Sequence, residues 1–397
     1  TLKVWKRELR EESWTMARRN AQRSSADPEY GDWYRIIEVW NYRFHSPLSQ
    51  EVLPGIPSPI IAKDMVIVPD PSNRSFLGVK VGDGEVLTSS NILSTRLSYA
   101  STPVYINPFL LFASNGAIYQ FFFREKDISL KSVLSDPKIL PIDYTAPVSA
   151  YGKAFFILRE CALLYQPDTG EHWFIPIRLT QSEDFLRSPV LWKEELILLS
   201  RYGEILALPF KNKNQYSLKR ISKPLSGTIC SSPCLVGETL YFEFLNEEGL
   251  RGIYAYNLRS KNLERIGVEE GVCSPDDNHL NFSPAAFQDG VLISSDITPR
   301  LFYVSGGPPI RVTPIDLEIQ TGRLQVHQTS HIFFCILGNR LVGRTPGGFF
   351  HLDLLNPKEG AIEVFRPRSE IVGQPLNYGQ RLFFITQEGV RCYAILK

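Results

Sequence analysis

The sequence predicts an all-β fold made from one structural unit that is repeated along the chain, and three observations support this. A small residue followed by proline recurs at intervals of 42 to 51 residues over the first six copies. Each copy continues with a turn and a short apolar run, which is typical of β-strands. A third strand follows in each copy, and a fourth strand follows in every copy except the eighth. Four antiparallel strands in about 45 residues form one propeller blade, so we expect an eight-bladed β-propeller, with seven blades as the alternative.

The prolines of the repeat are expected to open the innermost strand of each blade. Proline donates no hydrogen bond to a β-ladder, and the first position of a strand tolerates this loss. One copy, near Phe334, keeps the strand pattern without the dipeptide. The repeat prolines are Pro59, Pro103, Pro147, Pro189, Pro233, Pro284 and Pro375.

The two ends of the repeat region complement each other. The eighth copy stops after its third strand, and a strand-like segment at residues 36–44 precedes the first copy. Pairing these two segments would close the ring and remove exposed sheet edges. We therefore expect one domain, residues 34–397, that is closed by an N-terminal strand.

Residues 1–33 have a different composition, with Leu2, Trp5, Leu9 and Met16 spaced among many charges. This pattern predicts a short amphipathic helix followed by a linker. The helix could pack on the propeller, lead from an upstream domain, dock a partner or lie on a membrane surface. We expect the propeller to be one domain of a larger bacterial protein.

The composition of the chain limits its possible partners and indicates its cellular compartment. Lys and Arg total 43 against 42 Asp and Glu, so a net charge of +1 gives no overall attraction to nucleic acid. No apolar run approaches the ~20 residues of a membrane-spanning helix. The six cysteines are scattered, which favours reduced thiols in the cytoplasm. A periplasmic protein with one or two disulfides is the alternative.

The segment at residues 163–173, LLYQPDTGEHW, resembles the pyrroloquinoline-quinone-like repeat of one β-propeller family. Asp168, Thr169, Gly170 and Trp173 match the positions at which a strand ends, turns and presents a tryptophan to the neighbouring blade. The resemblance implies either of two kinds of protein. Some members are dehydrogenases that hold a quinone and calcium on the axis beside a Cys-Cys pair, and others are non-catalytic scaffolds that bind proteins.

This chain has no Cys-Cys dipeptide and no recognisable set of calcium ligands. The resemblance therefore favours a non-catalytic platform for a protein or peptide, with no cofactor and no metal. A quinone- or metal-dependent oxidoreductase stays as the alternative. So does a carbohydrate or small-ligand binder that uses the axial funnel, for which aromatic side chains at the channel mouth would be the sign.

Other chemical motifs are weak. Cys230 and Cys234 flank a blade boundary and are expected to be core thiols, since a zinc site needs two further ligands. His327 and His331 fall near a predicted strand, where residues four apart lie ~13 Å from each other. Ser188 lacks the Gly-x-Ser-x-Gly context of a hydrolase nucleophile.

Two groups of charged residues are candidates for binding. Arg159 and Arg201 each lie 12 residues after their repeat proline, and Arg74 and Arg300 lie at offsets of 15 and 16. The turns between second and third strands share one face of a propeller. The four arginines could therefore form a basic rim for an acidic peptide or another anionic partner. The alternative is that they lie in solvated loops.

The longest connection between blades is acidic. It contains Glu269, Glu270, Asp276 and Asp277. Unusually long loops are often functional. This loop could contact a partner, bind calcium or be solvated.

Overall fold

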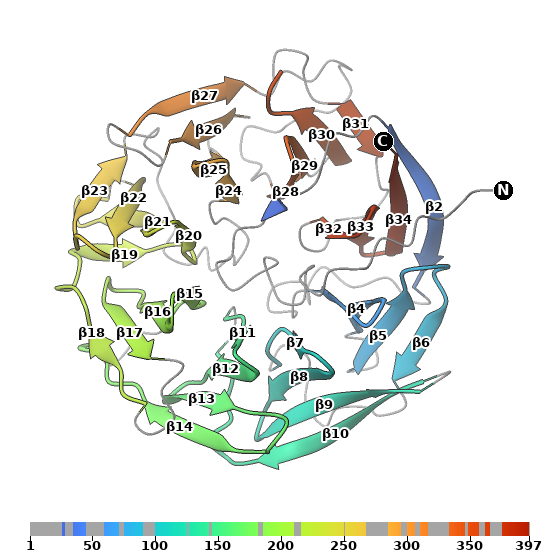
Figure 1. The fold of residues 1–397 in the computed structure, drawn as a ribbon, viewed down its shortest axis with the longest axis horizontal. Coiled ribbons are helices and arrows are strands. Elements are labelled where there is room, and N and C mark those ends of the chain that lie inside the picture. The colour runs from blue at the N-terminus through green and yellow to red at the C-terminus, as the bar shows by residue number, and fades with distance from the viewer. Residues whose placement is uncertain are drawn as a thin grey trace.

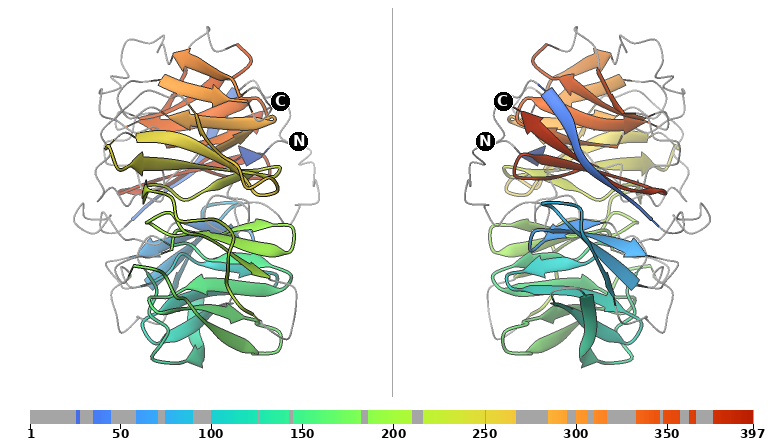
Figure 2. Two further views of the ribbon diagram at one scale, coloured as in Figure 1. Left: turned by 90° about the vertical axis from the view of Figure 1, so that its left-hand side faces the viewer. Right: turned by 90° about the vertical axis from the view of Figure 1, so that its right-hand side faces the viewer.

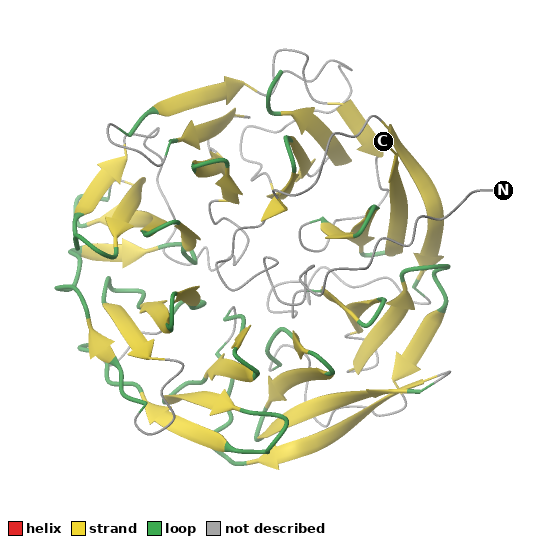
Figure 3. Cartoon of the chain, in the orientation of Figure 1, coloured by secondary structure: helices red, strands yellow, loops and turns green. Residues whose placement is uncertain are grey.

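The computed structural model shows eight blades arranged as a ring (Figure 1). All regular elements of the described residues are strands (Figure 3). The prediction of an eight-bladed β-propeller is confirmed, and the seven-bladed alternative is wrong. The structure describes residues 26–27, 35–44, 59–70, 75–89, 100–124, 127–142, 145–181, 186–209, 216–249, 251–266, 285–294, 300–305, 310–316, 333–345, 348–356, 362–365 and 375–396.

Within each blade the first strand lies nearest the axis and the fourth lies outermost (Figure 1). Blade 1 comprises β3 (Ile60–Ala62), β4 (Met65–Asp70), β5 (Ser75–Lys80) and β6 (Val86–Ser89). Blade 2 comprises β7 (Val104–Ile106), β8 (Phe109–Ser114), β9 (Ala117–Phe123) and β10 (Asp127–Ser135). Blade 3 comprises β11 (Val148–Ala150), β12 (Lys153–Ile157), β13 (Cys161–Tyr165) and β14 (His172–Pro176). Blade 4 comprises β15 (Val190–Trp192), β16 (Glu195–Leu199), β17 (Ile205–Pro209) and β18 (Lys219–Arg220).

The second half of the ring follows the same plan. Blade 5 comprises β20 (Cys234–Val236), β21 (Thr239–Asn246), β22 (Arg251–Asn257) and β23 (Leu263–Ile266), and β19 (Gly227–Ile229) also pairs with β21. Blade 6 comprises β24 (Ala285–Phe287), β25 (Gly290–Ser294), β26 (Arg300–Val304) and β27 (Val312–Asp316). Blade 7 comprises β28 (Phe333–Leu337), β29 (Arg340–Thr345), β30 (Gly348–Asp353) and β31 (Ile362–Phe365). Blade 8 comprises β32 (Leu376–Tyr378), β33 (Arg381–Thr386), β34 (Gly389–Leu396) and the N-terminal β2 (Arg35–Arg43).

The ring is closed by the N-terminal strand, as predicted. β2 pairs antiparallel with β34 along its whole length, from Arg35 opposite Leu396 to Arg43 opposite Gly389 (Figure 1). Trp40 of β2 also donates a hydrogen bond from Nε1 to the carbonyl oxygen of Val81 in blade 1, at 3.1 Å. Blade 8 therefore contains strands from both ends of the repeat region, and the Trp40 side chain links it to blade 1 by a hydrogen bond.

The repeat prolines lie one residue earlier than expected. Pro59, for example, is buried and directly precedes β3 instead of opening it. The same holds for Pro103, Pro147, Pro189, Pro233 and Pro375, whereas Pro284 lies outside the described residues. The prolines thus lie outside the ladder, where a missing N–H group costs nothing.

The hydrophobic core lies between adjacent blades, because each strand alternates its side chains between two neighbours. In β12, Ala154 and Phe156 pack into the cluster shared with blade 2. Phe155 and Ile157 pack into the cluster shared with blade 4. Both faces of each sheet are therefore apolar, which explains why the sequence runs are almost continuously hydrophobic.

Trp173 packs between blades 3 and 4, where its repeat position predicted it. Its ring meets the Tyr216 ring edge-on, with centroids 5.2 Å apart. The buried Lys153 amino group donates to the Tyr216 hydroxyl at 2.7 Å and lies 5.5 Å from the centre of the Trp173 ring. Two aromatic rings thus hold this buried cation at the blade interface.

Two connections in the sheet arrangement were not predicted. β6 and β10, the outer strands of blades 1 and 2, pair in parallel through two residues each, so these blades form one eight-stranded sheet. Ala26 and Asp27, within the expected linker, form β1, which pairs in parallel with the inner strand β28. The predicted helix falls on residues 1–25, outside the described residues. No helix among the described residues is long and apolar enough to cross a membrane.

We predict that Gly84 is a steric requirement of ring closure. Gly84 and Gly170 both lie in turns between a third and a fourth strand, at φ +79° and +74°. A β-carbon at Gly84 would approach the Trp40 ring to 2.8 Å, whereas one at Gly170 would meet nothing within 4 Å. Gly170→Ala should cost about 1 kcal/mol of unfolding free energy from the backbone alone. Gly84→Ala should cost about 2–4 kcal/mol, because overpacking adds to that strain.

Urea denaturation of the two variants beside the wild type measures the difference. Equal losses for Gly84→Ala and Gly170→Ala would show that Trp40 is not packed against this turn.

Candidate functional site

The topology divides the turns between the two faces of the ring. Figure 2 shows the ring edge-on, with the strands running between these faces. One face, here called the connection face, carries the connections between blades and the turns between second and third strands. The opposite face, here called the hairpin face, carries the turns between first and second strands and those between third and fourth strands. The predicted arginine rim belongs to the connection face.

Arg159 and Arg201 do occupy equivalent turns, but they differ in exposure. Arg159 is exposed, and its backbone N–H donates to the carbonyl oxygen of Leu140 at 2.9 Å. Arg201 is half-buried and lies 5.5 Å from the centre of the Tyr202 ring. Of these two arginines, Arg159 is therefore the more exposed to solvent.

The remaining predicted site residues cannot be placed as side chains. Arg300 opens β26, and only its backbone is described. Arg74, Glu269, Glu270, Asp276 and Asp277 lie outside the described residues. Their roles stay predictions.

Further cations lie on the same face. Lys138, Arg178 and Lys223 are exposed in the connections that leave blades 2, 3 and 4. Arg220 lies at the end of β18, where the chain reaches this face. We call the set of Lys138, Arg159, Arg178, Arg201, Arg220 and Lys223 the basic arc.

Sequence reasoning missed four members of the basic arc because it compared only one kind of turn. Lys138, Arg178, Arg220 and Lys223 come 9 to 13 residues before the proline of the following blade. That offset is a weak signal, since connections between blades vary in length.

Acidic residues bound the arc. Glu160 is exposed beside Arg159, and Asp136 is half-buried near Lys138. At blade 5 the turn between β21 and β22 exposes Glu247 and Glu248. Among the described residues, the connection face thus changes from mainly basic over blades 2 to 4 to acidic at the blade 5 turn.

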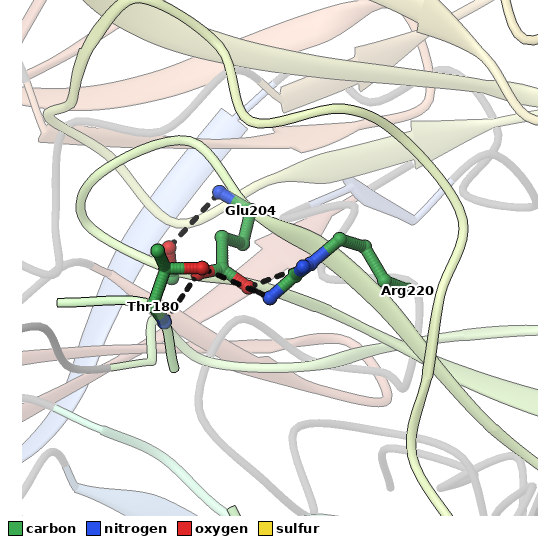
Figure 4. Close-up of polar contacts among 4 residues, drawn as sticks. Thr180, Glu204 and Arg220 are labelled. Atoms are coloured by element: carbon green, nitrogen blue, oxygen red, sulfur yellow. Dashed lines mark hydrogen bonds and ion pairs between the residues drawn. The ribbon is translucent and has the colours of Figure 1, made fainter. Parts of the chain in front are cut away.

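A buried carboxylate positions one guanidinium of the arc (Figure 4). Glu204 follows the second strand of blade 4, and its side chain is 2% exposed, against 45% for Arg220. Oε2 of Glu204 accepts from Nε of Arg220 at 3.0 Å, and Oε1 accepts from the N–H of Thr180 at 2.7 Å. Nη2 of Arg220 also donates to Oγ1 of Thr180 at 3.0 Å. This cluster fixes the connection from blade 3 onto blade 4.

The environment of Glu204 favours its charged form. Burial alone would raise the pKa of this carboxyl, but hydrogen bonds from Thr180 and Arg220 and the nearby guanidinium charge outweigh it. The pKa of Glu204 is therefore held below its usual range. The arrangement keeps Arg220 in place with half of its side chain still in solvent.

Arg187 adds a second fixed cation beneath this face. It is buried, and its Nη2 and Nε donate to the carbonyl oxygen of Ile229 at 2.7 and 3.2 Å. The contact spans one repeat and joins blade 4 to the segment that enters blade 5. A buried charge needs such hydrogen bonds to offset its lost hydration.

The weak motifs of the sequence fall into structural roles. Ser188 is fully buried, and its Oγ accepts from the N–H of Ala146 in the neighbouring blade at 3.0 Å. Cys230 and Cys234 are both buried. His327 and His331 lie outside the described residues. The described residues contain no group of three or more metal-ligating side chains.

No protein-family model matches the sequence, and a search of curated proteins finds no significant match. Solved structures do match. A computationally designed protein, Ika8, aligns with a TM-score of 0.61 and 9% identity, covering 86% of this chain and 97% of its own. BamB from Moraxella catarrhalis aligns with a TM-score of 0.57 and 11% identity, covering 92% of this chain and 98% of its own.

A europium-containing methanol dehydrogenase aligns with a TM-score of 0.56 and 9% identity, covering 97% of this chain and 98% of its own. Identities this low show the fold alone. The fold is that of a β-propeller. Since one similar structure is an enzyme, the fold by itself does not separate enzymes from binding proteins.

We predict that Glu204→Gln lowers the unfolding free energy by about 1–3 kcal/mol near pH 7, because it removes the charge that Arg220 pairs with. The folded-state pKa of Glu204 lies below its unfolded value. The stabilisation is therefore fully present above the unfolded pKa and is lost as pH falls through the folded pKa.

Urea denaturation at about pH 7 and at about pH 3 checks this prediction. Glu160→Gln, an exposed neighbour on the same face, is the matched control and should have little effect. A deficit of Glu204→Gln that is as large in acid as at neutral pH would contradict the assigned pairing.

Proposed function

We propose that the protein is a non-catalytic binding platform whose connection face docks an acidic segment of a protein partner across the basic arc. The observation that carries the proposal is the clustering of exposed cations in the loops of three consecutive blades. Lys138, Arg159, Arg178, Arg220 and Lys223 are all exposed there.

The free energies of exposed ion pairs favour binding by a cluster of cations over binding by a single one. One exposed ion pair contributes only about 0.2–1 kcal/mol, so no single arginine of the arc would hold a partner. Several cations on a rigid ring act together, raise the association rate and select an acidic partner. Arginine further suits carboxylates because its planar guanidinium donates two parallel hydrogen bonds.

The charge arrangement also supports a protein partner over a nucleic acid. In blade 5, the next blade around the ring, the turn on the same face exposes Glu247 and Glu248, which would repel a continuing phosphate backbone. A protein segment can follow its acidic residues with a basic or neutral stretch, and so can match both parts of the face. The net charge of +1 likewise supplies no general attraction to polyanions.

We also propose that the chain belongs to the pyrroloquinoline-quinone-like repeat family. Gly170 adopts φ +74° in the turn that the family motif places there. Trp173 packs against blade 4, as the motif implies. These features support a relationship to that family.

We predict that a double charge reversal in the arc, Arg159→Glu with Arg178→Glu, weakens binding of an acidic peptide at least about tenfold. A labelled oligoglutamate peptide titrated by fluorescence anisotropy is the probe. Wild-type affinity should fall steeply with added salt, since the Debye length is only about 8 Å at physiological ionic strength.

The matched control reverses Arg259 and Lys261, two exposed cations in a turn of blade 5 on the hairpin face. This variant changes the net charge equally and should bind like the wild type. The proposed face would be refuted if both double variants weakened binding equally, or if neither of them weakened it. Tighter binding of inorganic polyphosphate than of oligoglutamate would show a general anion site and would overturn the protein-partner assignment.

A further inference from the structure

The cations of the basic arc differ in how firmly their side chains are held. The Lys138 amino group lies 5.4 Å from the centre of the Phe174 ring, and the Arg201 guanidinium lies 5.5 Å from the centre of the Tyr202 ring. Three exposed cations have no side-chain hydrogen bond or ion pair with another described residue: Arg159, Arg178 and Lys223. Such side chains lose rotamer freedom when a ligand orders them, which offsets part of the binding energy.

Arg220 is held by polar groups of the protein before any ligand arrives (Figure 4). Oε2 of Glu204 accepts from Nε at 3.0 Å and also from Nη2, and Nη2 donates to Oγ1 of Thr180 at 3.0 Å. The accepting carboxylate is itself fixed, because its side chain is 2% exposed and Oε1 accepts from the N–H of Thr180. Two of the three guanidinium nitrogens are therefore bound within the protein, and the orientation of the third is set.

The third nitrogen is the one that a ligand can use. Nη1 of Arg220 has no acceptor among the described residues, and 45% of the side chain is exposed. Together Arg220 and Glu204 carry no net charge, so the pair adds little to the long-range attraction of an acidic partner. What the pair offers is a short-range hydrogen bond from a donor that needs no further ordering.

We infer that Arg220 is the anchor of the basic arc, at which Nη1 holds one carboxylate side chain of the partner, and that Glu204 is the residue that positions it. The inference rests on the proposed function, because it names the group of the acidic segment that the arc holds. Exposed charges mainly change association and its salt dependence, whereas a hydrogen-bonded charge with a buried partner mainly changes dissociation. Arg159 and Arg178 therefore act on association, and Arg220 acts on dissociation.

Stopped-flow fluorescence with the labelled oligoglutamate peptide measures both rate constants. Arg220→Lys keeps the positive charge but removes the planar fork that Glu204 holds. We expect this variant to raise the dissociation rate constant at least about fivefold and to change the association rate constant by less than about twofold. Arg159→Gln combined with Arg178→Gln should do the reverse, lowering association and its salt dependence with little effect on dissociation.

The role of Glu204 is tested by a change for which charge and positioning predict opposite results. Glu204→Gln makes the face more positive, so charge alone would tighten binding of an acidic peptide. Loss of positioning instead raises the dissociation rate constant several-fold. Glu160→Gln makes the same change of charge at an exposed carboxylate and should not raise it. In an Arg220→Gln background the effect of Glu204→Gln should disappear, because Glu204 acts through Arg220.

Thr180→Val is the mildest change, since it removes one acceptor of Arg220 and keeps the charge pair. It should raise the dissociation rate constant by a smaller factor, and circular dichroism under the binding conditions checks that each variant is folded. If the wild type does not bind the peptide, the proposed function itself is wrong. If the wild type binds but Arg220→Lys and Thr180→Val leave dissociation unchanged, or Glu204→Gln slows it, only the inference about the anchor is wrong.

Discussion

The pairing of β2 with β34 is the constraint on which the rest of the structure depends. Every other blade is formed by consecutive strands, whereas blade 8 takes its outer strand from residues 35–43. Because each blade buries both faces against its neighbours, an unclosed ring would leave two apolar sheet faces in water. The cluster around Phe383 accordingly contains residues of blades 7, 8 and 1 together. Trp40 extends the closure to the turn at Gly84.

The packing of adjacent blades brings residues one repeat apart into contact at several places. Ala146 with Ser188, Arg187 with Ile229 and Lys193 with Glu238 are separated by 42, 42 and 45 residues. The connections between blades all reach one face, where the basic arc lies, and the two-residue hairpins all reach the other.

The candidate sites could be predicted from the sequence only in part. Counting from the repeat prolines correctly placed Arg159 and Arg201 in equivalent turns. It could not show that Arg201 lies against Tyr202 while Arg159 is solvated, because exposure depends on how each turn folds back. It also missed Glu204, since a carboxylate in a polar turn gives no sign that Thr180 and Arg220 will enclose it.

The sequence by itself determined the number of blades, the closing strand and the packing position of Trp173, because these follow from short-range patterns repeated at a fixed spacing. Only the tertiary structure decided the joining of β6 to β10, the pairing of β1 with β28 and the residues that form each face. The physical reason is that strand periodicity is a local property of the chain. Contacts between loops depend instead on the rotation between neighbouring blades and on connections of unequal length, which no local pattern records.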